Sequence, residues 1–339
     1  MSNKSLNRSQ VIDLAKILYN LSDHVSYVSN KYFKAPLQVN KSYKKINSGK
    51  KPRIVELPKK SISNNSVDNA KIQSIAYYSV AILYFIDVLE KNFLPSDLVN
   101  FYNNINSLRI GRIEKKSIYN DSSGVYYSCL NYIKIKNHLI YSIYHELFHM
   151  ASTKIINGVI YSGFYIVDDK KMIGLGLNEG YTELIANRYF SNQRTSRLLK
   201  NNYDYKYDLN EEYPLQVLIA SKLEEIVGKN KMESLYLTAN LHGLIKELEQ
   251  YTSREQIDKF LSNMDFLHSN MDNIMKFSIK NKKLHDAYVE ICGFLDECYR
   301  NKLANRYNKK SLRKEFLKDL EFVYDEYFSM DRKKSERKK

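Results

Sequence analysis

Two histidines and a glutamate stand at a spacing that can hold a metal ion. The run is His145-Glu146-Leu147-Phe148-His149, which matches the pattern H-E-x-x-H. Residues four apart on an α-helix lie on one face, so both imidazoles can bind the same ion. The Glu146 carboxylate lies beside them, where it can accept a proton from a metal-bound water. The pattern therefore indicates metal-assisted hydrolysis.

The residues around this pattern favour a helix. Residues 138–152 contain no Gly or Pro, and apolar side chains recur at helical spacing. These apolar residues are Leu139, Ile143, Leu147 and Met150. We predict a helix over 138–152 that packs through this stripe and presents His145 and His149 toward a cleft. The alternative is coincidence, because a random chain of this length contains H-E-x-x-H roughly once in a hundred cases.

A second acidic segment follows at residues 176–183. The sequence there predicts a helix from Asn178 to Phe190, with Asn178 as its N-cap. Glu179 and Glu183 are four apart and share a face of that helix. A catalytic zinc site needs a third protein ligand and an open position for water, and a carboxylate on a neighbouring helix can supply the ligand. The other acid can hydrogen-bond a ligand histidine and fix its tautomer.

H-E-x-x-H followed by a helix that begins Asn178-Glu179-Gly180 resembles the gluzincins, the clan of the thermolysin-like proteases and the zinc aminopeptidases. The resemblance covers roughly residues 125–190. The interval from His149 to Glu179 is longer than these families usually have. It leaves room for an extra hairpin and leaves the subfamily open.

The resemblance implies a ligand set and a mechanism. The ligands of one Zn²⁺ per chain would be His145, His149 and Glu179. Glu183 would hydrogen-bond a ligand histidine, although it could instead replace Glu179 as the third ligand. Glu146 would act as general base on a zinc-activated water and then pass the proton to the leaving amine. The clan uses Tyr or His to stabilise the oxyanion, and the candidates are Tyr161, Tyr165, Tyr181 and His242.

The sequence thus predicts a zinc-dependent peptidase that acts on a peptide or protein substrate. Two other classes stay open: a metal-binding regulatory or effector protein with little turnover, and a nucleic-acid-associated protein. The second depends on charge, because residues 31–60 carry a net +9 and residues 300–339 a net +7 of the chain's +15. Such segments can attract nucleic acid or an anionic membrane. A solvated linker and tail is the favoured interpretation, since no nucleic-acid-binding motif accompanies the charge.

The sequence predicts a cytoplasmic protein without an integral membrane segment. Three cysteines, Cys129, Cys292 and Cys298, do not make a disulfide framework. The first ten residues lack the apolar core of a signal peptide. The most apolar stretch, residues 76–89, contains Asp87 and is too short to cross a bilayer.

The predicted fold class is α+β. It combines a zincin-like catalytic core, made of a small sheet, the H-E-x-x-H helix and the Glu179 helix, with a mainly α-helical C-terminal lobe. The predicted organisation is an N-terminal helix within 1–33, a basic linker or loop over 34–66, the catalytic core over 67–191, the helical lobe over 192–328 and a basic tail over 329–339.

Within the core, the pattern predicts helices over 68–92 and from Pro95 to about Leu108, then strands within 109–136 with a turn at 120–124. The run Val125–Ile135 is predicted to be one strand that pairs with extended substrate. A hairpin over 155–166 around Asn157-Gly158 and a polar loop at 168–171 follow. In the lobe, we predict a helix from Pro214 to Gly228, a capping box at Ser253–Gln256 and helices over 284–300 and 311–328.

Overall fold

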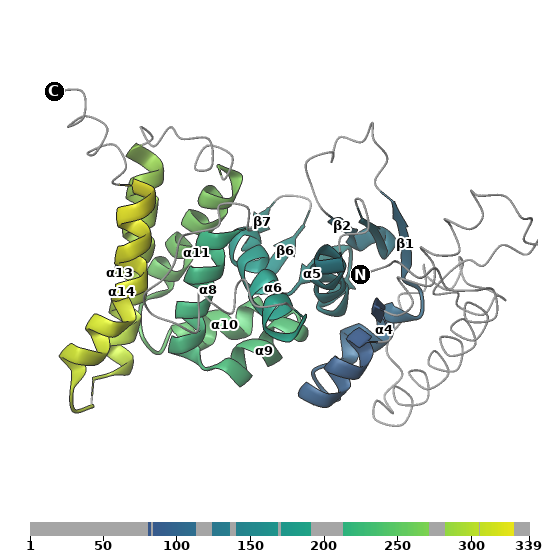
Figure 1. Ribbon diagram of the computed structural model, residues 1–339, viewed down its shortest axis with the longest axis horizontal. Coiled ribbons are helices and arrows are strands. Elements are labelled where there is room, and N and C mark those ends of the chain that lie inside the picture. Colours follow the sequence, from purple (N-terminus) through teal and green to yellow (C-terminus); the bar gives the residue numbers. More distant parts are fainter. Residues whose placement is uncertain are drawn as a thin grey trace, which may run out of the picture. The chain divides into compact units, whose positions relative to one another are not determined.

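The structure is a computed structural model that describes residues 81–112 without residue 83, 124–135, 140–168, 171–190, 213–270, 282–304 and 306–328. The chain forms two compact units, Met1–Ile160 and Tyr161–Lys339. The fold is mixed α and β, with small sheets and a helical C-terminal region (Figure 1). The predicted N-terminal helix, the linker over 34–66 and the tail over 329–339 lie outside the described residues.

The first unit has helices before its sheet. Residues 81–92 are helical at every described position, and α4 spans Val99–Ile105. The second helix is shorter than predicted, because the residues after Pro95 form hydrogen-bonded turns, among them Leu98 N to Pro95 O at 3.2 Å. The ring of Phe85 packs edge-on against Phe101 and Phe148, with centroids 6.1 and 5.0 Å away. These fully buried rings join the helices to the H-E-x-x-H segment.

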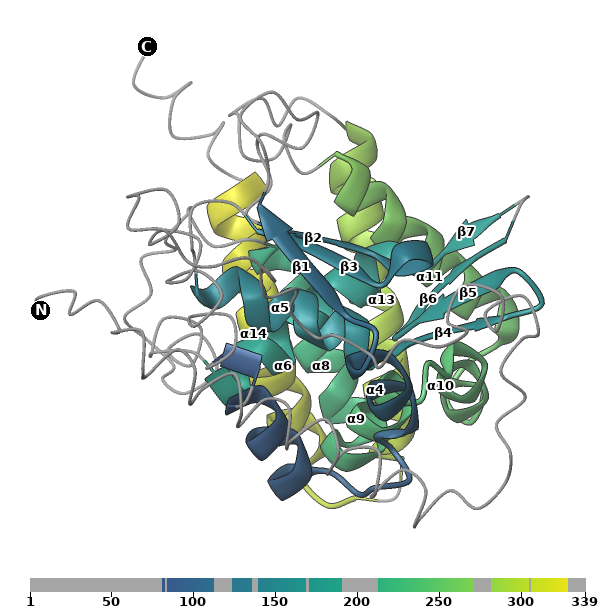
Figure 2. The same ribbon diagram turned by 90° about the vertical axis from the view of Figure 1, so that its right-hand side faces the viewer.

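Three short strands form the sheet of this unit. They are β1 (Arg109–Arg112), β2 (Gly124–Tyr127) and β3 (Tyr132–Ile135), in the order β1-β3-β2 (Figure 2). β1 runs parallel to β3, and β2 runs antiparallel to it.

The prediction of one continuous strand over Val125–Ile135 is wrong. The 3₁₀ turn η1 (Ser128–Leu130) and Asn131 reverse the chain between β2 and β3. Asn131 has a φ of 44°, a left-handed conformation that asparagine tolerates better than most residues. Its side-chain amide donates to Asn104 O at 2.6 Å and to Ser107 Oγ at 2.8 Å, which fixes the turn against the end of α4. These partners are more than 20 positions away in sequence, so alternation alone could not indicate the reversal.

Helix α5 spans Ile140–Ala151, which confirms the predicted helix that carries H-E-x-x-H. Every side chain from Ile143 to Ala151 is buried, whereas the prediction assigned burial to one stripe. Leu139 of that stripe lies outside the described residues. The helix contacts β2 and β3 (Figure 2). Just past its end, the Thr153 hydroxyl donates to His149 O at 2.6 Å and satisfies a carbonyl of the last turn.

The predicted hairpin around Asn157-Gly158 is confirmed. Strands β4 (Thr153–Ile156) and β5 (Val159–Ser162) flank these two residues, whose φ angles are 52° and 85°. Positive φ at both central residues is what a tight hairpin turn requires. β6 (Tyr165–Val167) and β7 (Met172–Ile173) follow, and the strand order is β4-β5-β6-β7. The predicted polar loop joins β6 to β7, with Lys171 N donating to Asp168 Oδ1 at 2.7 Å.

The second unit is mainly helical (Figure 1). Its helices are α6 (Leu175–Phe190), α8 (Pro214–Val227), α9 (Lys229–Leu237), α10 (Leu241–Leu248), α11 (Arg254–Ser269), α13 (Lys282–Lys302) and α14 (Lys309–Phe328). Pro214 begins α8 and Gly228 ends it, as predicted. Ser253 Oγ accepts from Gln256 N, which confirms the predicted cap of α11. The helices predicted over 284–300 and 311–328 correspond to α13 and α14, which both begin two residues earlier.

Candidate metal centre

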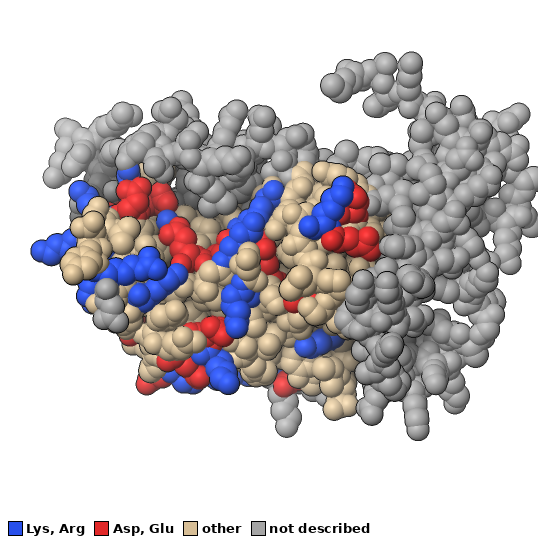
Figure 3. All heavy atoms as spheres, turned by 90° about the horizontal axis from the view of Figure 1, so that it is seen from below, with Lys and Arg blue, Asp and Glu red and all other residues tan. Residues whose placement is uncertain are grey.

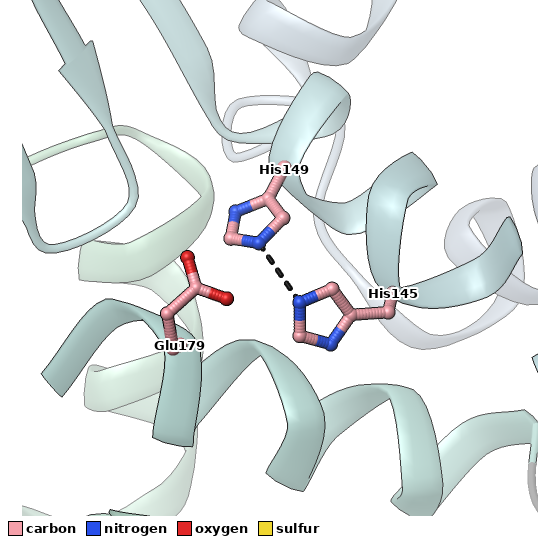
Figure 4. A group of neighbouring side chains, drawn as sticks. All are labelled: His145, His149 and Glu179. Carbon is pink, nitrogen blue, oxygen red and sulfur yellow. Dashed lines mark hydrogen bonds between the residues drawn. The ribbon is translucent and has the colours of Figure 1, made fainter. Parts of the chain in front are cut away.

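His145, His149 and Glu179 form a group that could hold a metal ion (Figure 4). Each offers one ligand atom, and these atoms all lie within 4.8 Å of one another. The two histidines project from α5, one turn apart, and Glu179 projects from α6. These are the three residues that the sequence predicted as ligands.

The two imidazoles are oriented to share a ligand. Their Nε2 atoms face each other at 3.0 Å (Figure 4), and the rings are inclined by 71°. Two ligands of a tetrahedral zinc ion, with bonds of about 2.0–2.1 Å, lie about 3.3 Å apart. Both side chains are buried, at 5% and 8% exposure, and the nitrogen of an imidazole can bind a metal ion through its lone pair. The donor set of two imidazoles and one carboxylate therefore fits zinc.

Glu146 lies against the first residue of β2. It is 6% exposed. A Cβ added to Gly124 would come within 2.8 Å of Glu146 Oε1 and 2.9 Å of its Cγ. Glycine at this position thus leaves room for the carboxylate, and the side chain of the predicted base runs beside the start of a strand.

The segment that carries Glu179 begins earlier than predicted. Helix α6 starts at Leu175, so Asn178 lies inside the first turn and does not cap it. The Asn178 side chain instead accepts a hydrogen bond from Phe164 N at 3.0 Å. The helix end is satisfied by a residue from another helix, because the Asp265 carboxylate accepts from Gly174 N at 2.9 Å and Gly176 N at 2.8 Å. A local capping pattern could not indicate this partner.

Glu183 is not part of the three-residue group. It is half-buried on α6, one turn beyond Glu179, and accepts a hydrogen bond from Asn187 Nδ2 at 2.8 Å. Its proposed hydrogen bond to a ligand histidine stays a prediction.

The four candidates for oxyanion stabilisation have different surroundings. Tyr181 is fully buried, and its hydroxyl donates to Glu224 at 2.8 Å within the core of the second unit. His242 is exposed on α10, and Tyr161 is half-buried in β5. Tyr165 is half-buried in β6, where burial raises its pKa and the charges of Asp265 and Glu179 raise it further. The charge of the candidate ligand Glu179 is thus one cause of the raised pKa of Tyr165.

Sequence reasoning missed Gly124 and Asp265. A glycine at the start of a strand is a weak signal of close approach, and Gly124 appeared only as the end of a predicted turn. Asp265 carries no local signal, since it lies inside α11 and its partners are about 90 positions away in sequence.

Charge is mixed over the described surface. Figure 3 shows acidic and basic side chains interspersed on one face. Within the described part of the basic segment 300–339, Arg313 forms two hydrogen bonds to Asp296, at 2.6 and 2.7 Å, and Arg300 lies 3.3 Å from the same carboxylate. The basic segment 31–60 lies outside the described residues.

Comparisons with known proteins found no matching family model, no matching curated protein and no matching solved structure. Among the described residues, none of the helices has both the length and the apolar character that a bilayer span requires.

Proposed function

We propose that the chain is a zinc-dependent peptidase, with the sheet, α5 and α6 in a zincin-like arrangement. One observation carries the proposal: the ligand atoms of His145, His149 and Glu179 all lie within 4.8 Å of one another. Two of these residues belong to an H-E-x-x-H helix, which places a carboxylate next to the ligands. A cytoplasmic location and a peptide or protein substrate stay predictions.

The chain's own residues would divide the work. His145, His149 and Glu179 would hold the ion, which when bound lowers the pKa of water and polarises a carbonyl. Glu146 would accept a proton from the attacking water and give it to the leaving amine.

The position of β2 supports a peptide as substrate. β2 is the last strand in the order β1-β3-β2, and its first residue, Gly124, touches the Glu146 side chain. An extended peptide that pairs with β2 would run beside the general base, because strand addition aligns a backbone with a sheet edge. The main-chain carbonyl of the peptide would then be the group presented for attack.

Tyr165 is the candidate we favour for the oxyanion donor. Burial raises the pKa of its hydroxyl, and the charges of Asp265 and Glu179 raise it further, so the hydroxyl lies within electrostatic reach of the candidate ligand Glu179. A phenol that remains protonated can donate a hydrogen bond to a developing negative charge. Replacing Tyr165 by Phe should lower turnover without releasing the metal, whereas Tyr161→Phe should leave both unchanged.

Metal content is the first test. Purified full-length protein should contain about one zinc per chain by elemental analysis. Glu179→Ala should lose most of it, whereas Glu183→Ala, a matched change one turn along the same helix, should retain it. Equal zinc in wild type and Glu179→Ala would remove Glu179 from the ligand set. A wild type that takes up no zinc when the metal is supplied would contradict the proposal.

Turnover separates a peptidase from a metal-binding regulator. Cleavage of a diverse peptide library, followed by mass spectrometry, should fall about 10²–10⁴-fold in Glu146→Gln, because general acid–base catalysis typically contributes that much. The variant should keep its zinc, since Glu146 is not in the ligand group. Zinc binding without cleavage of any peptide would favour the regulatory or effector alternative.

A further inference from the structure

The helix that carries Glu179 is anchored at its first turn by another helix of the same unit. Asp265 projects from α11, and its two carboxylate oxygens accept hydrogen bonds from two backbone N–H groups at the start of α6. Oδ2 takes Gly174 N at 2.9 Å, and Oδ1 takes Gly176 N at 2.8 Å. These amides are among the groups that a helix leaves unsatisfied at its N-terminus. A negative charge there is also favoured by the helix dipole.

The backbones of α6 and α11 approach so closely that the anchor has little freedom. A Cβ added to Gly176 would come within 2.1 Å of Met264 O and 3.1 Å of Asp265 N. Gly174 has a φ of 84°, and a Cβ there would lie 2.1 Å from Phe164 O. Only glycine permits both the close approach and the left-handed turn that aim these N–H groups at Asp265.

The same turn is held on a second side. Asn178 accepts from Phe164 N at 3.0 Å, and the Thr182 hydroxyl lies 2.6 Å from that of Tyr236 on α9. All of these groups are buried. Glu179 follows Asn178 directly, so its backbone is fixed by contacts within the second unit.

We propose that Asp265 is a positioning residue for Glu179: it fixes the first turn of α6 and thereby the direction of the ligand carboxylate. The inference rests on the proposed metal site. It makes α11 of the helical lobe part of the scaffold that positions that site. A ligand that is held before the metal arrives binds it more tightly, because less ordering accompanies binding.

Zinc affinity tests the proposal. Asp265→Ala removes both acceptors, and Asp265→Asn keeps one carbonyl oxygen and removes the charge. Competition with a chromophoric zinc chelator should give a higher zinc Kd for the alanine variant, by up to about 10–100-fold, which is the effect of losing a hydrogen-bond partner of a ligand itself. The asparagine variant should lie in between. Asp258→Asn is the matched control, because Asp258 is exposed on the same helix and pairs with Arg254.

Amide hydrogen exchange of the zinc-free protein supplies a readout that does not depend on the metal. Exchange over residues 174–179 should be faster in Asp265→Ala, while exchange over α13 should match the wild type. Unchanged zinc Kd in both Asp265 variants would overturn the role of Asp265 alone. A wild type without zinc would overturn the proposed function and this role together. Faster exchange throughout the second unit in both variants would show a general stability effect and would also overturn the positioning role.

Discussion

The two helices that carry the candidate ligands are held in different ways. Helix α5 is buried among apolar side chains, and Phe148 at its centre is fully buried against the ring of Phe85. Helix α6 is also largely buried, but polar side chains fix it at both ends. Asp265 holds the first turn, and Arg188 in the last turn binds Glu224 at 2.5 Å and Glu233 at 2.7 Å.

The difference matters because substitutions affect apolar packing and ion pairs in different ways. Apolar packing depends on volume and tolerates similar shapes, so a conservative change in α5 has a graded effect. A buried ion pair depends on both partners, since removing one leaves an uncompensated charge. Helix α6 therefore presents Glu179 on a frame that single polar substitutions can disturb.

Among the substitutions considered, loss of Arg188 should cause the largest decrease in the free energy of unfolding. Arg188→Met leaves the partly buried carboxylate of Glu224 and the buried carboxylate of Glu233 without their main cation, and breaking a buried pair costs about 3–5 kcal/mol. Burial acts to lower the pKa of Arg188, but its hydrogen bonds and the charge of Glu224 outweigh this and raise it. The free energy of unfolding from urea titration should fall by that amount.

A substitution in α5 provides the matched comparison for Arg188→Met in α6. Phe148→Ala should cost a similar amount, about 3–5 kcal/mol, through the cavity that it leaves. Adding Glu224→Gln to Arg188→Met should recover part of the loss, because it removes a stranded charge. A loss below about 1 kcal/mol for Arg188→Met would fit an exposed ion pair and would contradict the distinction between the helices.

A smaller effect is expected where β2 meets α5. Gly124→Ala puts a methyl group 2.8 Å from Glu146 Oε1, so the flexible end of Glu146 must move. Misplacing a catalytic group by about 1 Å can cost up to about 10²-fold in rate. Peptide cleavage should fall about tenfold or more. Zinc content should not change, because His145 and His149 are untouched. A wild-type rate of cleavage in the variant would show that Gly124 of β2 does not position Glu146, the proposed general base.

The two helices also differ in how much of each could be predicted from the sequence. Helix α5 and its histidines could be predicted, because the chemistry and the apolar pattern lie within one short segment. The position of the candidate ligand Glu179 was predicted from its neighbours Asn178 and Gly180, although the predicted role of Asn178 as a helix cap was wrong. The start of α6 could not be predicted, because Asp265 supplies its cap from α11 and capping rules describe only local partners.

Two turns between strands differ in the same way: one depends on adjacent residues and the other on distant ones. The Asn157-Gly158 hairpin was predicted because both residues of the turn are adjacent and each tolerates positive φ. The reversal at Asn131 was missed, because its amide binds Asn104 and Ser107, which lie before β1. A turn that depends on its own residues can be predicted from the sequence, whereas a turn that is fixed by distant hydrogen bonds is predicted as a continuous strand.

The smallest effect concerns the thiols, of which the buried one in the second unit reports on the opening of that unit. Cys129 is exposed in the turn between β2 and β3, and Cys298 is buried in α13. Burial raises the pKa of Cys292 and of Cys298 from 9.0 to about 12, so both stay protonated and unreactive near pH 8. Iodoacetamide at pH 8, followed by peptide mass spectrometry, should therefore label Cys129 first.

Unfolded thiols ionise near pH 9.0, whereas these two folded thiols ionise near 12, so their contribution to stability is complete below pH 9.0 and is lost as the pH rises toward 12. The labelling rates also test whether the two units open separately. Arg188→Met should increase the labelling rate of Cys298 and leave that of Cys129 unchanged, because the ion pairs of Arg188 lie within the second unit. Phe148→Ala should leave the labelling of Cys298 unchanged, because Phe148 belongs to the first unit. Faster labelling of Cys298 in Phe148→Ala would mean that the two units open together, and α5 and α6 would then share one stability.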